Sequence, residues 1–177
     1  SKGEIIMKRS FIASKKISIF CVLGLMIGLF CNPAAWGAAY FTDDMEGAVN
    51  WTGASPWAAT TADYHSASTA WTDSPGGEYQ SLANVSLAMS NPIDLSPSVN
   101  PKLVFWHKHQ LETDWDYGRV EISTNGGTNW THLRSFTGIS EWRREQIDLS
   151  DYKADTVKIR FRLDADNRIT YDGWYID

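Results

Sequence analysis

The fold is decided by the stretch Val157-Lys158-Ile159-Arg160-Phe161-Arg162-Leu163. Its apolar residues alternate with charged ones, which is typical of a strand that has one face in the core and the other in water. Similar short runs fill the chain after Ala39, separated by clusters of Gly, Pro, Asn, Asp and Ser, and no helical stripe interrupts them. The pattern predicts an all-β domain.

An internal echo indicates how the strands are arranged. Ile93-Asp94-Leu95-Ser96 and Ile147-Asp148-Leu149-Ser150 are each followed, at the same spacing, by a long apolar strand. Two such units packed face to face predict a two-sheet antiparallel jelly-roll sandwich. The predicted strands are residues 39–42, 68–71, 86–89, 92–94, 102–110, 117–123, 130–135, 142–148, 156–163 and 173–177.

Residues 1–38 are predicted to be a leader that contains a secretory signal peptide. Met7-Lys8-Arg9 and Lys15-Lys16 form a basic region, an apolar run covers 17–30, and small residues follow at Ala34, Ala35, Gly37, Ala38 and Ala39. The apolar run is shorter than a bilayer requires, so we expect export without stable membrane insertion after cleavage. Cys21 and Cys31 both lie in this leader, so the exported domain would have no disulfide, which favours a bacterial envelope or extracellular protein.

The domain itself is expected to cover residues 39–177. Its end, Asp172-Gly173-Trp174-Tyr175-Ile176-Asp177, reads as a strand that stops in mid-course, so we expect downstream domains of the same chain as partners. From Ala38 onward, 11 Lys and Arg stand against 20 Asp and Glu, a net charge of −9. Such a surface repels nucleic acid and suits cations.

The ordered motifs of the domain resemble those of a known family. They are Asp73-Ser74-Pro75-Gly76-Gly77-Glu78-Tyr79, Leu103-Val104-Phe105-Trp106-His107, Asp116-Tyr117-Gly118-Arg119-Val120-Glu121-Ile122-Ser123-Thr124-Asn125-Gly126-Gly127, Trp142, Ile147-Asp148-Leu149-Ser150, Ile159-Arg160-Phe161-Arg162 and Gly173-Trp174-Tyr175-Ile176-Asp177. Together, over residues 40–177, they resemble the MAM-like domains found beside secreted bacterial metallopeptidases of the immune inhibitor A type and in other exported proteins. The resemblance implies a jelly-roll domain without catalysis, used for adhesion or substrate attachment and often holding Ca²⁺. The disulfide cysteines of animal MAM domains and a His-Glu-x-x-His zinc motif are both missing from this sequence.

A Ca²⁺ site is predicted from acidic residues near the two ends of the domain. Asp44 and Glu46 follow the first predicted strand of the domain, Asp73 lies in a glycine-containing turn, and Asp177 lies on the last strand. The first and last strands of a jelly roll usually lie near each other, so these carboxylates could supply the oxygen ligands that Ca²⁺ needs. The resemblance implies the same positions for Glu46, Asp73 and Asp177. The alternative is that these residues are solvated turn formers.

A ligand-binding edge is predicted in the loop that follows the strand at 102–110. Glu112, Asp114 and Asp116 surround Trp115 there, and sandwich proteins often bind through loops on a rigid scaffold. We expect an extracellular glycan or protein surface as the partner. Alternatively, the loop is an exposed acidic turn or an additional cation site, and Trp115 folds back onto the sheet. A glycosidase would need its two carboxyls across a cleft rather than in one short loop.

His107-x-His109-x-x-Glu112 leaves an enzymatic alternative open, because two His and a carboxylate on one face can hold a catalytic metal as in cupins. The second cupin motif is missing, and the histidines share their face with Leu103 and Phe105, which favours a core position. The sequence therefore predicts a non-catalytic adhesion or substrate-binding module of a larger secreted bacterial protein, stabilised by Ca²⁺ and serving a peptidase as an accessory domain. The alternatives are a carbohydrate-active enzyme, a cupin-like metal-dependent fragment, and a spacer without ligand.

Overall fold

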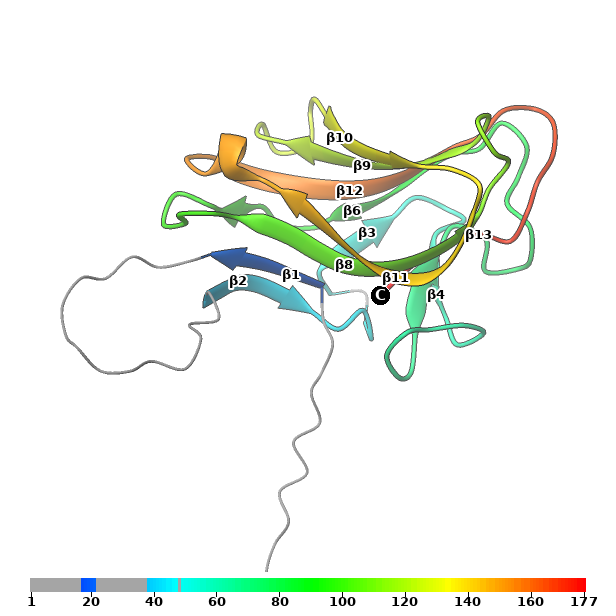
Figure 1. The fold of residues 1–177 in the computed structure, drawn as a ribbon, viewed down its shortest axis with the longest axis horizontal. Helices are drawn as coiled ribbons and strands as arrows, with labels where there is room; N and C mark the ends of the chain where they lie inside the picture. The colour runs from blue at the N-terminus through cyan, green and yellow to red at the C-terminus, as the bar shows by residue number, and fades with distance from the viewer. Residues whose placement is uncertain (1–16, 22–37, 48) are drawn as a thin grey trace, which may run out of the picture.

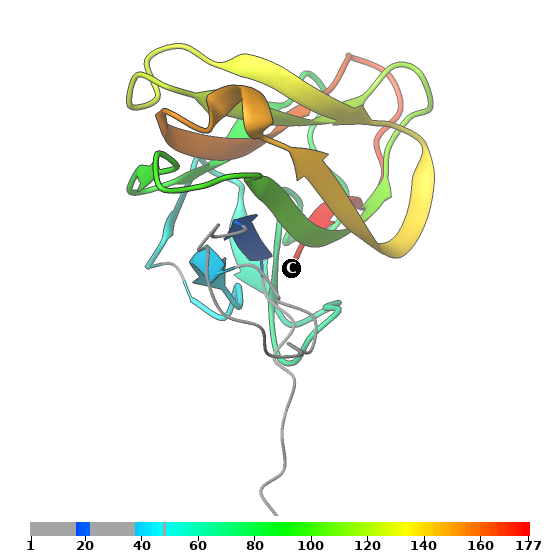
Figure 2. The ribbon, with the colours of Figure 1, turned by 60° about the vertical axis from the view of Figure 1, so that its left-hand side comes forward.

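The computed structural model describes residues 17–21, 38–47 and 49–177, and it confirms the predicted sandwich (Figure 1). Two antiparallel sheets pack face to face as layers (Figure 2), and the described helical structure is one short 3₁₀ helix, η1 (Ser150–Tyr152). In this part of the chain no helix has the length and hydrophobicity needed to cross a bilayer. The strands are β1 (Ile17–Cys21), β2 (Ala38–Asp43), β3 (Trp51–Gly53), β4 (Ala58–Thr60), β5 (Ala70–Thr72), β6 (Asn84–Met89), β7 (Ile93–Asp94), β8 (Lys102–Gln110), β9 (Tyr117–Ser123), β10 (Thr131–Phe136), β11 (Ile139–Asp148), β12 (Thr156–Asp164) and β13 (Gly173–Ile176).

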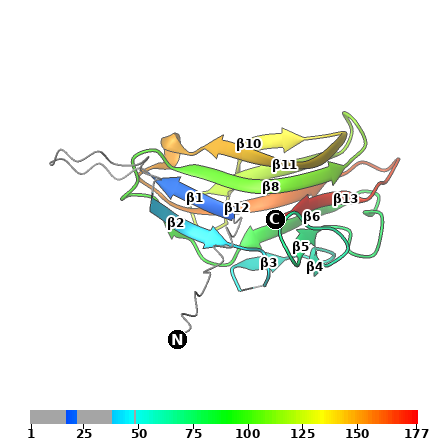
Figure 3. The ribbon, with the colours of Figure 1, turned by 60° about the horizontal axis from the view of Figure 1, so that its bottom comes forward.

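The first sheet is built around β8. Its order is β2-β1-β8-β13-β5-β4, and β11 pairs with the other edge of β8. β13 pairs with residues 107–110 of β8 and β1 with residues 102–104, so these two strands follow one another along the same edge (Figure 3). The second sheet has the order β10-β9-β12-β6-β3, with β7 paired to the start of β12.

The positions of several strands depart from the sequence-based prediction. β3 and β4 were not predicted, because three residues are too few to show an alternating pattern. β11 begins at Ile139 rather than at Trp142, and an irregularity in its pairing with β8 between Ser140 and Arg143 obscures the alternation at its start. The other predicted strands are present, with ends that match the prediction or differ from it by one or two residues.

The segment Ile17–Cys21, which the sequence assigns to the predicted signal peptide, forms a strand. In the structure it is β1, paired on one side with β2 and on the other with β8. The uncleaved chain therefore uses this segment as a strand of the first sheet. The rest of the predicted leader up to residue 37 lies outside the described residues, and signal cleavage stays a prediction.

The core lies between the sheets and is unusually aromatic. Trp174 of β13 is fully buried and packs edge-on against Phe161 of β12, with ring centroids 5.6 Å apart, and against Trp57 at 6.3 Å. Opposite it, a Cβ added to Gly118 would lie 2.7 Å from Cε3 of Trp174. Only glycine lets β9 approach this ring so closely, because real Cβ contacts of that length clash.

Candidate binding loops and carboxylate clusters

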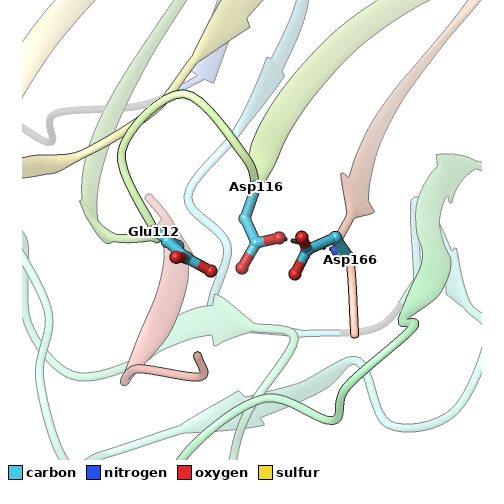
Figure 4. Close-up of side chains that lie close together, drawn as sticks. All are labelled: Glu112, Asp116 and Asp166. Carbon is cyan, nitrogen blue, oxygen red and sulfur yellow. Dashed lines mark hydrogen bonds between the residues drawn. The ribbon is translucent and has the colours of Figure 1, made fainter. Parts of the chain in front are cut away.

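Three carboxylates meet at one end of the sandwich (Figure 4). Glu112 and Asp116 come from the loop between β8 and β9, and Asp166 follows β12. One carboxylate oxygen from each lies within 4.8 Å of the others. Glu112 and Asp116 belong to the predicted edge, whereas Asp166 lies fifty residues beyond Asp116 in the chain and was not singled out from the sequence.

The loop between β8 and β9, which carries Glu112 and Asp116, has a rigid base. The buried Leu111 donates its N–H to the carbonyl of Gly138, and the Thr137 hydroxyl donates to the carbonyl of Glu112 over 3.1 Å. Asp114 has a left-handed φ of 65°, and its N–H donates to Oγ1 of Thr137. These bonds to the β10–β11 turn hold the loop in one conformation, and they carry Asp114 outward, away from the three-carboxylate cluster.

Asp116 is the buried member of the cluster and is held on both carboxylate oxygens. Its Oδ2 accepts a hydrogen bond from the Tyr79 hydroxyl at 2.5 Å, and its Oδ1 accepts from the N–H of Asp166 at 2.7 Å. Burial, together with the Asp116 carboxylate beside it, raises the pKa of Tyr79 well above its usual value. Tyr79 is therefore a permanent donor, and it fixes the carboxylate toward Glu112 and Asp166 (Figure 4).

Trp115, at the tip of the same loop, is exposed. Its relative accessibility is 52%, so the ring does not fold into the core, which answers the alternative left open by the sequence. The guanidinium of Arg168 lies 4.6 Å from the ring centroid, and Arg168 also faces Asp166 at 3.8 Å. A cation over an indole face orients the ring at the surface.

The predicted Ca²⁺ ligands near the start of the domain accept hydrogen bonds from neighbouring residues of the protein. The Glu46 carboxylate accepts hydrogen bonds from the N–H and hydroxyl of Ser68 and from the N–H of Thr69. Burial is the largest single influence on the pKa of Glu46 and favours a raised value, but the hydrogen bonds from Thr69 and Ser68 together outweigh it and lower the pKa. Asp44 is exposed and accepts from the N–H of Glu46 at 3.4 Å.

Asp177 and Asp73 lie at opposite ends of the last strand. The buried Asp177 carboxylate accepts from the backbone N–H groups of His65 and Ser66, at 2.8 and 2.7 Å. Asp73 accepts from the N–H of Trp174 at 2.6 Å. Trp174 and Asp177 are three positions apart on an extended strand, roughly 10 Å, whereas a shared Ca²⁺ needs carboxylate oxygens about 2.4 Å from the ion. The structure thus brings Glu46 and Asp177 to neighbouring parts of the 65–69 segment and leaves Asp73 apart from Asp177.

His107 and His109 both point into the sandwich. Their rings are stacked with centroids 5.4 Å apart. Nδ1 of His107 lies 3.2 Å from Nε1 of Trp174, and Nε2 lies 3.2 Å from Nε of Arg143; a neutral imidazole accepts one of these two hydrogen bonds. Burial, reinforced by the charges of His109 and Arg143, lowers the pKa of His107 to about 3, so the imidazole is neutral. Within the described residues neither histidine belongs to a group of three potential metal ligands.

The fold and the loops together define the structural class of the protein. It is a two-sheet antiparallel jelly-roll sandwich whose loops at one edge carry acidic and aromatic side chains. No family model matches the chain. The chain is similar to a segment of Bacillopeptidase F from Bacillus subtilis (strain 168), with 40% identity over 102 residues. That match covers 57% of this chain and 7% of the relative, so the chain spans a small part of the relative's length.

One solved structure that resembles the chain is TmCBM61 in complex with beta-1,4-galactotriose. The TM-score is 0.46 with 17% sequence identity, and the match covers 72% of this chain and 82% of that chain.

Proposed function

We propose that residues 39–177 form a non-catalytic binding module of a larger, exported bacterial protein, of the MAM-like kind, and that it attaches this protein to an extracellular glycan or protein surface. The similarity to a segment of Bacillopeptidase F supports an accessory role beside a peptidase. No sequence motif in this chain supplies a nucleophile or a zinc-binding helix, which favours binding over catalysis.

The observation that carries the proposal is the exposed Trp115 on a loop with a rigid base. An indole face contributes large contact area at low conformational cost, and it stacks well on sugars and on protein side chains. Glu112, Asp114 and Arg168 around the ring supply acceptors and donors for polar groups of the ligand.

The test compares Trp115→Ala with the parent chain for adhesion to bacterial cell walls, insoluble polysaccharides and an extracellular-matrix protein array. Loss of binding with an unchanged melting temperature is the expected result, because the ring is exposed and its deletion leaves no cavity. Tyr64→Ala removes another exposed aromatic ring and serves as the matched control. Equal binding by the parent and Trp115→Ala would show that this edge is not the binding site.

We further propose that Ca²⁺ stabilises the module, at Glu112, Asp116 and Asp166. Three convergent carboxylates are a suitable start for the six to eight oxygens that Ca²⁺ takes. A ligand at one hundred times its Kd stabilises the fold by about 2.7 kcal/mol, a rise in Tm of roughly 5–10 °C for a domain of this size.

Scanning calorimetry in millimolar Ca²⁺ and in chelator measures this shift. Asp116→Asn with Asp166→Asn should abolish it, while Glu46→Gln with Asp177→Asn should leave it in place. If only Glu46→Gln with Asp177→Asn abolishes the shift, Ca²⁺ binds at the positions predicted from the sequence. If the parent melts at the same temperature in chelator and in Ca²⁺, the calcium proposal is wrong.

A further inference from the structure

A groove on the outer face of the second sheet lies apart from the loop edge described above. It has a volume of about 460 Å³, within the range of roughly 300–1,000 Å³ found for small-molecule sites. Its walls come from β3, β6, β12 and the hairpin between β9 and β10. Its lining includes Thr52, Ser86, Ser90, Gly127, Trp130 and Lys158.

The hairpin wall of the groove is held in place by local hydrogen bonds. The Ser123 hydroxyl oxygen accepts from the N–H of Gly127 at 2.9 Å and from that of Asn125 at 3.3 Å. Gly127 has a φ of +101°, and a Cβ at this position would lie 3.4 Å from Cζ2 of Trp130. The indole of Trp130 therefore packs against a fixed turn.

Trp130 also forms a cation–π contact. The guanidinium carbon of Arg160 lies 4.5 Å from the Trp130 ring centroid, and the ring is only half buried. The same Arg160 donates to the Glu121 carboxylate, which holds the guanidinium over the indole. The guanidinium covers one face of the ring, and the part of the indole that lines the groove remains for the CH face of a sugar.

The charge of this face is opposite to that of the protein as a whole. Arg119, Lys158, Arg160 and Arg162 point outward from β9 and β12, against two carboxylates, Glu121 and Asp164, whereas the whole chain has a net charge of −5. The three arginines are all paired with those carboxylates. Lys158 lines the groove and forms no ion pair with any residue that the structure describes.

We propose that this groove binds an acidic oligosaccharide, with a uronic acid carboxylate against Lys158 and a neighbouring sugar ring on Trp130. The opposite wall supplies hydroxyl groups: Oγ1 of Thr52 and Oγ of Ser90 are 2.9 Å apart, and Ser86 also lines the groove. The ammonium of Lys158 can pair with the carboxylate of such a ligand, and the indole of Trp130 can pack against the CH face of a sugar ring. The hydroxyl groups of the opposite wall can bond to the sugar hydroxyls.

The groove is independent of the Trp115 edge. Trp115 lies just before the first residue of β9, whereas the groove lies beside the last residue of that strand. Because a strand of seven residues spans roughly 23 Å, the two sites are far apart. Binding at one place can therefore be removed without touching the other, and failure of one proposal leaves the other standing.

The experiment titrates the chain with a matched pair of ligands, β-1,4-linked glucuronic acid tetrasaccharide and cellotetraose, which differ only by the carboxylates. Galacturonic and mannuronic acid tetrasaccharides are titrated as further acidic ligands. Calorimetry gives Kd, and the indole N–H resonance of Trp130 reports the site. We expect at least one acidic tetrasaccharide to bind at least tenfold more tightly than cellotetraose, with a Kd that rises with salt.

Lys158→Gln should weaken acidic binding at least tenfold, and Trp130→Ala should weaken it while leaving the salt dependence in place. Lys102→Gln, a half-buried lysine on the other sheet, is the matched control and should bind as the parent does. Thermal melting verifies that each variant is folded. The proposal is wrong if no acidic tetrasaccharide binds, if cellotetraose binds equally well, or if Lys158→Gln binds as the parent does.

Discussion

Replacing Asp73 with Asn should stabilise the protein increasingly as the pH rises. The Asp73 side chain is fully buried; its Oδ1 accepts from the N–H of Trp174, and its Oδ2 has no hydrogen-bond partner. Burial raises the pKa of Asp73 from 3.8 to about 7, the hydrogen bond from Trp174 opposes this rise, and the charge of Asp172 adds to it. Asn resembles the protonated carboxyl in shape and cannot ionise.

The sign follows from the two states of the chain. In the unfolded chain Asp73 ionises near pH 4, whereas in the folded protein it stays protonated up to about pH 7. The folded state binds the extra proton between these values, so stability falls as the pH rises through this window and stays low above it. A shift of about three units corresponds to roughly 4 kcal/mol, of which about 2.5 kcal/mol develops between pH 5 and pH 8.

The assay is urea unfolding of the parent and of Asp73→Asn at pH 5, 6, 7 and 8. The difference in free energy of unfolding between the two proteins should grow by about 2.5 kcal/mol in favour of Asn across this range. Taking the difference cancels the titration of His107 and His109, which are present in both proteins. A difference that stays constant with pH would refute the reasoning, because it would mean that Asp73 is ionised in the folded protein throughout.

Two further substitutions test the packing and the ion pairs. Gly118→Ala would place a methyl group 2.7 Å from Cε3 of Trp174, and it should cost about 1–3 kcal/mol in calorimetry; an unchanged Tm would mean that the indole can shift freely. Glu121→Gln should cost about 2 kcal/mol at pH 7, because the buried carboxylate bonds to Arg160 and Arg162. Burial favours a raised pKa for Glu121, but the two arginines outweigh it and lower the pKa. Its stabilisation is therefore present above about pH 4.5 and lost as the pH falls further, and the Glu121→Gln variant should lack this part of the acid transition.

The fold was largely predictable because its determinants are local. The alternation in residues 157–163 assigns each side chain to the core or to solvent, and the structure places Ile159 and Phe161 in the core as that alternation predicts. The strands at Lys102–Gln110 and Tyr117–Ser123 were predicted with their observed limits for the same reason. The pattern failed where strands were too short to show a period, as in β3 and β4.

The candidate sites were only partly predictable, because they depend on which loops the sheets bring together. The sequence by itself determined an acidic loop around Trp115 and a chain of alternating strands, since composition and period are properties of neighbouring residues. The pairing of β9 with β12 decided that Asp166, rather than Asp114, joins Glu112 and Asp116. The same sheet decided that Trp130 and Lys158 share one groove. These partners are many residues apart, and only the pairing of distant strands, driven by burial of their common core, sets the distance between them.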